Sequence, residues 1–169
     1  MTAVHAPATA EPEIAIRERP PSPKRLSRKV LLAGTLLAGA VIAWAKNTTR
    51  NGRPLLEDSQ TLARLAQVYT HANVSDCLGA RVFATRLAKE PDLAYGPAAK
   101  IFCTEAFITD SADLLDLAAP DSLVRGKEGL GIVEMGYRHS TATTIYGGTS
   151  EVLRSMVAER RLGLPRSRA

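Results

Sequence analysis

An all-α fold, a four-helix bundle with a short extra helix, is what the sequence predicts. Hydrophobic residues make up 45% of the 169 residues and aromatic residues only 5%. The core must therefore consist of Leu, Ala, Val and Ile, which suits packed helices better than an aromatic-rich sheet. Apolar positions recur at helical spacing over long stretches, and none alternates with period two, so we expect no sheet. Two very long helical segments predict an antiparallel bundle.

The N-terminal part of the chain divides into a disordered segment and a first helix. Residues 1–25 are rich in Ala, Pro and Glu, and prolines prevent a long helix there. The first helix is expected at about residues 26–49. Because residues 30–45 are apolar nearly all round, this helix should be the most buried element. The Asn-Gly-Arg-Pro sequence at 51–54 ends it.

The second helix is expected from about residue 57 to residue 89, before Pro91. Glu57 or Asp58 caps its start or complements the helix dipole. One face is predicted by the 3–4–3 spacing of Leu62, Leu65, Tyr69 and Ala72.

The third helix is expected over about residues 96–119, where apolar residues recur every seven positions at Ile101, Ile108 and Leu115. A loop should follow, then a short helix at about 132–140 and a last helix at 150–162. The chain is long enough to form one domain with a core of its own.

Charge and cysteine content favour a cytoplasmic helical protein. The net charge is +5, but the basic residues are spread along the chain, so we expect no nucleic-acid partner. Cys77 and Cys103 match no metal spacing and are interpreted as reduced and half-buried. His71 and His139 lack partners at metal spacing, so neither receives a role and no metal is expected.

A membrane anchor is the alternative interpretation of residues 30–45. This apolar stretch is flanked by basic groups on both sides, yet it is short for a membrane-spanning helix. Gly34 and Gly39 within it suit close helix packing inside a bundle. We therefore expect a buried helix and no membrane contact.

The organising feature of the chain is a turn that opens the last helix. The Gly-Gly pair at 147–148 lets the backbone bend sharply and approach a ligand. Thr149 or Ser150 caps the helix, and Glu151 complements its dipole. Gly163 ends it. Backbone N–H groups at such a turn bind a carbonyl oxygen or a phosphate.

This stretch also carries a family resemblance. Residues 145–151, with 158–160 and 162–166, resemble the C-terminal signature of the acyl-CoA dehydrogenase family. A second match at residues 45–66 resembles the turn between the first two helices of the family's C-terminal domain. The resemblance covers residues 26–166 and implies the C-terminal helical domain alone, without the N-terminal helical domain and the middle β-domain.

The resemblance implies an FAD-dependent flavoprotein of fatty acid metabolism, an oxidoreductase. In this family a carboxylate removes the α-proton of an acyl-CoA thioester while a hydride leaves the β-carbon for the flavin. It implies flavin contacts at Tyr146, Gly147, Gly148 and Thr149. Arg50 lies near the family's arginine position, which reaches the FAD of a neighbouring subunit. The alternative role of Arg50 is a charge at a helix C-terminus.

The same comparison leaves the chain without a catalytic base. Many members carry a glutamate at the position of Gly147, and others carry it early in the first helix, at a position near Ser22 here. We therefore assign no catalytic residue and expect a truncated or partner subunit. It would share an FAD and acyl-CoA site in a homo- or hetero-oligomer with another acyl-CoA dehydrogenase subunit. The alternatives are a non-enzymatic helical oligomerisation protein derived from the family and a truncated product without function.

Overall fold

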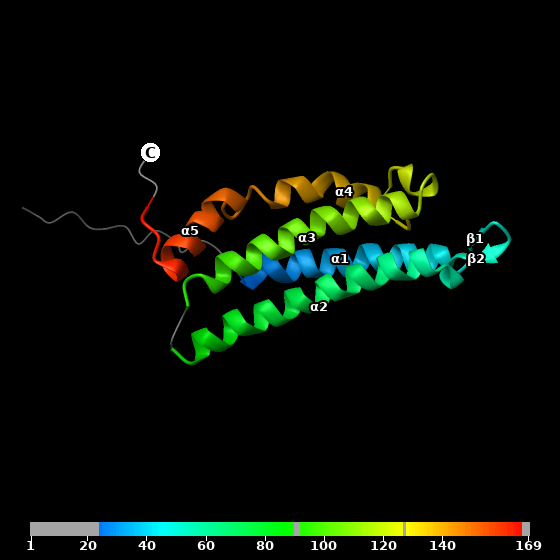
Figure 1. The fold of residues 1–169 in the computed structure, drawn as a ribbon. Coiled ribbons are helices and arrows are strands. Elements are labelled where there is room, and N and C mark those ends of the chain that lie inside the picture. Colours follow the sequence, from blue (N-terminus) through cyan, green and yellow to red (C-terminus); the bar gives the residue numbers. More distant parts are fainter. Residues whose placement is uncertain (1–23, 90–91, 127, 167–169) are drawn as a thin grey trace, which may run out of the picture.

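The computed structural model describes residues 24–89, 92–126 and 128–166, and this part of the chain is a bundle of helices lying side by side (Figure 1). The predicted all-α fold is therefore confirmed. The disordered segment predicted at 1–25 lies almost entirely outside the described residues, and so does Pro91. The helices are α1 (Lys24–Ala45), α2 (Ser59–Leu87), α3 (Tyr95–Leu117), α4 (Gly131–Thr143) and α5 (Ser150–Leu162).

A small hairpin joins α1 to α2, where we had expected no sheet. Strands β1 (Thr49–Arg50) and β2 (Arg53–Pro54) pair antiparallel across Asn51 and Gly52. These two residues have φ of 54° and 77°, the left-handed conformation that a tight Asn-Gly hairpin turn requires. The Asn-Gly pair thus turns the chain back on itself but does not end the helix, because α1 already ends at Ala45, before the predicted residue 49.

Two single-turn 3-10 helices complete the connections, η1 (Leu55–Glu57) before α2 and η2 (Asp121–Leu123) after α3. The predicted cap of α2 is confirmed at Asp58, whose carboxylate accepts hydrogen bonds from the Thr61 backbone N–H and hydroxyl, each at 2.8 Å. A satisfied N–H at this end fixes where α2 begins.

The buried face of α2 differs from the predicted one. Tyr69 is 69% exposed and Leu62 is exposed too, whereas the buried residues of α2 are Thr61, Val68 and Ser75. Leu65 and Ala72 are half-buried beside this stripe. The small side chains of the stripe let α1 and α3 approach closely, and the larger apolar ones are left on the outside.

Helix α3 is the centre of the bundle, because it contacts all four other helices. Its heptad residues Ile101, Ile108 and Leu115 are only half-buried. The fully inward positions are instead Ala99, Cys103, Thr104, Phe107, Asp110, Ser111, Leu114 and Leu117. A helix surrounded by neighbours is apolar on several sides, so periodicity alone does not identify its innermost face.

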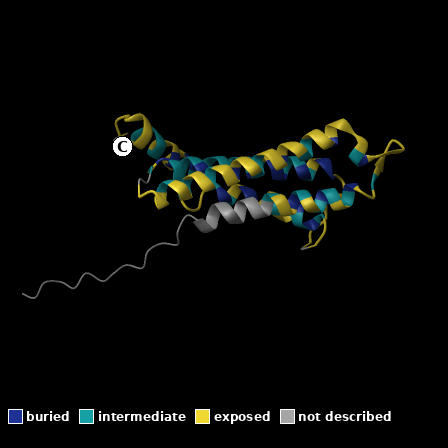
Figure 2. Ribbon diagram, turned by 90° about the horizontal axis from the view of Figure 1, so that it is seen from below, coloured by how far each residue is buried: buried dark blue, intermediate teal, exposed yellow. Residues whose placement is uncertain are grey.

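Helix α1 is less buried than the sequence suggested. Among its residues with described side chains, Leu37, Val41 and Ala45 are buried, but Leu36 is 62% exposed. Figure 2 shows buried residues where the helices meet and exposed ones on their outer faces. Within the described part of the chain α3, not α1, is thus the most buried element.

The remaining expectations concern the last helices and the cysteines. Helix α5 begins and ends as predicted, while α4 is longer than the predicted 132–140. Cys103 is buried, whereas Cys77 is exposed rather than half-buried. Within residues 24–89, 92–126 and 128–166, no helix is long and apolar enough to cross a membrane.

Candidate functional site at the Gly-Gly turn

The turn between α4 and α5 needs glycine at two consecutive positions. Gly147 has a φ of 75° and Gly148 a φ of 104°, which residues with a Cβ rarely adopt. A Cβ built on Gly148 would lie 3.2 Å from Cδ2 of Leu153, a buried residue of α5. The turn is therefore both conformationally special and closely packed on α5.

This turn leaves a row of backbone donors without partners. Among the described residues, no hydrogen bond is donated by the N–H groups of Gly147, Gly148 or Thr149. The next N–H, that of Ser150, donates to the Thr144 carbonyl at 3.2 Å. Unpaired N–H groups at a helix N-terminus form an acceptor-binding site, because the helix dipole adds positive potential there.

Two hydroxyls stand beside these donors. Thr149 caps α5 as predicted, since its Oγ1 accepts from the Val152 N–H at 3.3 Å, and its own O–H donates toward the Glu151 carboxylate. Ser150 is 5% exposed, and its Oγ has no hydrogen-bond partner among the described residues. A buried unpaired hydroxyl costs stability, so a bound group or water that completes it would be favoured.

Lys100 of α3 ties the turn to the centre of the bundle. Its Nζ donates to the Gly148 carbonyl oxygen at 2.8 Å. Burial lowers the pKa of Lys100, opposed by the charges of Glu105 and Glu151. Sequence reasoning missed this residue, because it lies 48 positions before Gly148 and only the fold brings the two together.

Tyr146, at the start of the turn, contacts His139 of α4. The phenol oxygen and the imidazole Nε2 are 3.2 Å apart, and the ring centroids are 6.0 Å apart. Tyr146 is 39% exposed, and partial burial raises the pKa of its phenol. Sequence reasoning assigned no role to His139, yet its ring is the group that contacts the tyrosine.

The carboxylate nearest the turn behaves as a helix-capping anion. The backbone N–H of Glu151 itself, and then the Thr149 hydroxyl, lower the pKa of this carboxyl. A carboxylate stabilised as an anion on the first turn of α5 matches the predicted dipole partner. It lacks the dry environment that raises the pKa of a catalytic base.

Arg50 does not join the turn within this chain. Its Nη2 donates to the carbonyl oxygen of Leu117 at 3.2 Å, so its charge lies at the C-terminal end of α3. Figure 1 places the hairpin that carries Arg50 at one end of the bundle and α5 at the other. The structure therefore groups Tyr146, Gly147, Gly148 and Thr149 but leaves Arg50 apart from them.

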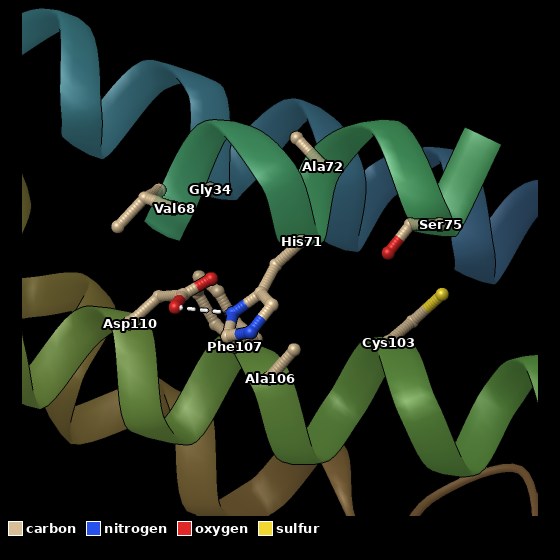
Figure 3. Close-up of a pocket in the computed structure, with 9 residues that line it drawn as sticks. All are labelled: Gly34, Val68, His71, Ala72, Ser75, Cys103, Ala106, Phe107 and Asp110. Atoms are coloured by element: carbon tan, nitrogen blue, oxygen red, sulfur yellow. Dashed lines mark hydrogen bonds and ion pairs between the residues drawn. The ribbon is translucent and has the colours of Figure 1, made fainter. Parts of the chain in front are cut away.

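A second polar cluster lies inside the bundle, at a small cavity of about 20 Å³ between α1, α2 and α3. Figure 3 shows His71 and Asp110 pointing toward each other there, with 2.7 Å between Nδ1 and Oδ1. Burial raises the pKa of Asp110, and the bond to His71 opposes that shift. Burial also raises the pKa of the Cys103 thiol, so this cysteine is an unreactive core residue.

The cavity has room for about one water molecule, which makes the His71–Asp110 pair a structural link between α2 and α3 rather than a substrate site. No group of three or more metal-ligating side chains that could hold a metal occurs in the part of the chain that the structure describes. The turn before α5 is thus the strongest candidate site.

The sequence and fold of this chain match those of a known protein family. Residues 29–162 match the family model described as acyl-CoA dehydrogenase, C-terminal domain. The chain belongs to the acyl-CoA dehydrogenase family. It is 31% identical, over 137 residues, to acyl-CoA dehydrogenase FadE26 of Mycobacterium tuberculosis, a match that covers 73% of this chain and 33% of the relative.

Solved acyl-CoA dehydrogenase structures show the same helical arrangement. The Mycobacterium tuberculosis ChsE4-ChsE5 complex matches with a TM-score of 0.72 and 27% identity, over 81% of this chain and 37% of that one. The Tcur3481-Tcur3483 steroid enzyme matches with a TM-score of 0.71 and 27% identity, over 85% and 38%. The Geobacillus kaustophilus acyl-CoA dehydrogenase, 21% identical with a TM-score of 0.75 over 84% and 36%, shares the fold. This acyl-CoA dehydrogenase chain therefore spans little more than a third of the length of these relatives.

Proposed function

We propose that this chain contributes the C-terminal helical side of an FAD and acyl-CoA site shared with another acyl-CoA dehydrogenase subunit. The observation that carries the proposal is the row of unpaired N–H groups at Gly147, Gly148 and Thr149. These donors suit the carbonyl and phosphate oxygens of a flavin nucleotide or a thioester. The missing Cβ atoms let such a planar group come close to the backbone.

Each residue of the turn would have a different role in binding. FAD, when bound, would supply the hydride acceptor for dehydrogenation of an acyl thioester. The N–H of Gly147 would hold an acceptor oxygen, the Thr149 hydroxyl would turn from Glu151 to donate to the bound group, and Tyr146 would border it. Lys100 would keep the turn in place through the Gly148 carbonyl.

The catalytic base would come from the partner subunit. The position where many family members carry the base is Gly147 in this chain, and Glu151 is held as a helix-capping anion. Two of the matched structures bear the names of protein pairs, ChsE4-ChsE5 and Tcur3481-Tcur3483. Such pairs support a hetero-oligomer.

The decisive experiment compares the chain alone with the chain co-expressed with a full-length acyl-CoA dehydrogenase. We expect the purified chain, given FAD and an acyl-CoA, to show no turnover, and the co-purified complex to carry visible flavin absorbance. Turnover by the single chain would disprove the partner-subunit role. A complex that carries no more flavin than the full-length partner alone would disprove the shared site.

A non-enzymatic oligomerisation role is the second candidate, favoured by the amount of apolar surface. Leu36, Leu87 and Leu162 are each more than 60% exposed. Exposed apolar surface on this scale is typical of interaction sites. This role predicts self-association of the chain without flavin, which sedimentation equilibrium at micromolar concentration measures. A stable monomer would contradict it.

A further inference from the structure

Helix α2 lies along one edge of the bundle and carries a regular row of exposed residues (Figure 1). The row advances along the helix by four and then three residues, over and over, from residue 62 to residue 87. Tyr69 in it is 69% exposed and Leu87 is 67% exposed. We call this row the α2 seam, and all its members are exposed: Leu62, Ala66, Tyr69, Asn73, Asp76, Ala80, Phe83 and Leu87.

The spacing of the α2 seam is that of a helix which packs on another helix. A four–three repeat sustained over more than three heptads is typical of a coiled coil. Within the chain α2 packs on α1 and α3 through a different stripe, the one that contains Val68. Between residues 62 and 84 only Asp76 and Arg81 are both charged and exposed. The solvent-facing side of a helix is ordinarily rich in charges, so the seam has the composition of a contact surface.

The order of the side chains along the seam identifies what covers it. We propose that two copies of this chain pair through the α2 seam, with the helices antiparallel about a two-fold axis midway between Asn73 and Asp76. In this register each aromatic ring faces an alanine, a leucine faces a leucine, and the amide faces the carboxylate. The facing pairs, the second member belonging to the second copy, are Leu62 with Leu87, Ala66 with Phe83, Tyr69 with Ala80, and Asn73 with Asp76.

The central polar pair selects this register over its alternatives. Asn73 donates one amide hydrogen to the Tyr69 carbonyl oxygen at 2.8 Å, and its second amide hydrogen can be donated to Asp76 of the other copy. A shift of one heptad in either direction would bury Asp76 against Ala66 or Ala80, where a carboxylate has no hydrogen-bond partner. A parallel pair in register would place the two Asp76 carboxylates opposite each other, and like charges repel.

The surface beside the seam leaves room for a second helix. An open groove of about 390 Å³ follows this face, and its lining includes the small exposed residues Thr70 and Cys77. The seam is about 38 Å long, given the rise of an α-helix, so a paired helix would cover the groove along with it. The proposal rests on the oligomerisation role, to which it gives a surface and a register, and not on the flavin site.

The test is sedimentation equilibrium of the purified full-length chain at micromolar concentrations. We expect a dimer that Tyr69→Lys weakens at least about tenfold, because the new charge would face Ala80 without a partner. Tyr137→Lys changes another exposed tyrosine, on α4, and as the matched control should leave the dimer unchanged. Both positions are exposed, so circular dichroism should show the native helix content in each variant.

Two substitutions of Asn73 test the register. Asn73→Asp sets two carboxylates opposite each other and should weaken the dimer at least about tenfold. Asn73→Lys sets a cation opposite Asp76 and should keep the dimer at least as tight as in the wild type. Added salt should reduce the difference between the two variants. A parallel pair would be weakened by both, because like charges would then meet at position 73.

Three outcomes overturn the proposal. A dimer that Tyr69→Lys leaves intact forms through another surface, which rejects the seam but keeps the oligomerisation role. Equal effects of the two Asn73 substitutions reject the antiparallel register. A monomeric wild-type chain rejects the two-copy interface; if Tyr69→Lys then releases a co-expressed full-length acyl-CoA dehydrogenase, the seam belongs to that partner instead.

Discussion

Replacement of Gly148 by valine is the sharpest test of how the turn is built. At a φ of 104° a residue with a Cβ is strained, by about 1–3 kcal/mol. The new Cβ would also lie 3.2 Å from Cδ2 of Leu153, which is 6% exposed and has little room to move. Overpacking of this kind costs about 1–3 kcal/mol. We expect Gly148→Val to lower the free energy of unfolding by about 3 kcal/mol.

Gly163→Val is the matched control, because Gly163 also has a positive φ, 67°, but a Cβ there meets no atom within 4 Å. It should cost only the left-handed strain, about 1–2 kcal/mol. Urea unfolding followed by circular dichroism measures both variants, and the native helical signal should hardly change in either. A Gly148→Val cost no larger than that of Gly163→Val would show that the turn is not packed against α5.

The same pair of variants separates binding from stability. In the co-purified complex Gly148→Val should lose its flavin absorbance, because a side chain that pushes against Leu153 displaces the turn and its unpaired N–H groups, whereas Gly163→Val should keep it. Full flavin retention by Gly148→Val would show that the turn only begins α5 and does not bind the flavin. The oligomerisation role would then be the better account of the chain.

Three further predictions concern the core, a buried carboxyl and the tether of the turn. Leu114→Ala should lower the free energy of unfolding by about 2–5 kcal/mol, because Leu114 is 0% exposed. The control Leu36→Ala, at an exposed position, should change the free energy of unfolding by less than about 1 kcal/mol in the same urea assay. Since burial raises the pKa of Asp110, the folded chain binds the proton of this carboxyl at a higher pH than the unfolded chain does. The free energy of unfolding should therefore increase as the pH falls from the folded pKa toward the unfolded pKa. Asp110→Asn should flatten this dependence in urea titrations at stepped pH. Lys100→Met should change stability by only about 1 kcal/mol, because the lost hydrogen bond is offset by the desolvation it relieves, yet the co-purified complex should retain less flavin. An unaltered pH profile or full flavin retention would contradict the respective argument.

Local signals in the sequence predicted helix ends much better than helix faces. The bounds of α5 followed from Thr149 and Gly163, which act through their own backbone and nearest neighbours. The Asp58 cap of α2 is equally local. The hairpin at Asn51 and Gly52 could also have been predicted, since Asn-Gly is a strong hairpin signal. The same two residues are also typical of a helix break, which is how we interpreted them.

The inner faces of α2 and α3 could not be predicted in the same way. Both helices carry apolar residues on several sides, and the packing of α1 and α3 selects the stripe of small residues at Thr61, Val68 and Ser75. The turn itself was predictable, because the Gly-Gly pair sets its backbone conformation locally. Its supports were not, because Lys100 reaches Gly148 only once α3 packs beside the turn.

The features that support the turn also make it costly to the isolated chain. The Ser150 hydroxyl is buried without a partner among the described residues, and the Lys100 ammonium is partly desolvated. Natural sequences tolerate such local conflicts mainly where binding compensates for them. A ligand at one hundred times its dissociation constant adds about 2.7 kcal/mol to the free energy of unfolding. The flavin-loaded complex should therefore resist urea better than the same complex stripped of flavin, and Gly148→Val should abolish that difference. An equal urea midpoint for the loaded and stripped complexes would mean that flavin binding does not compensate for these costs at the turn.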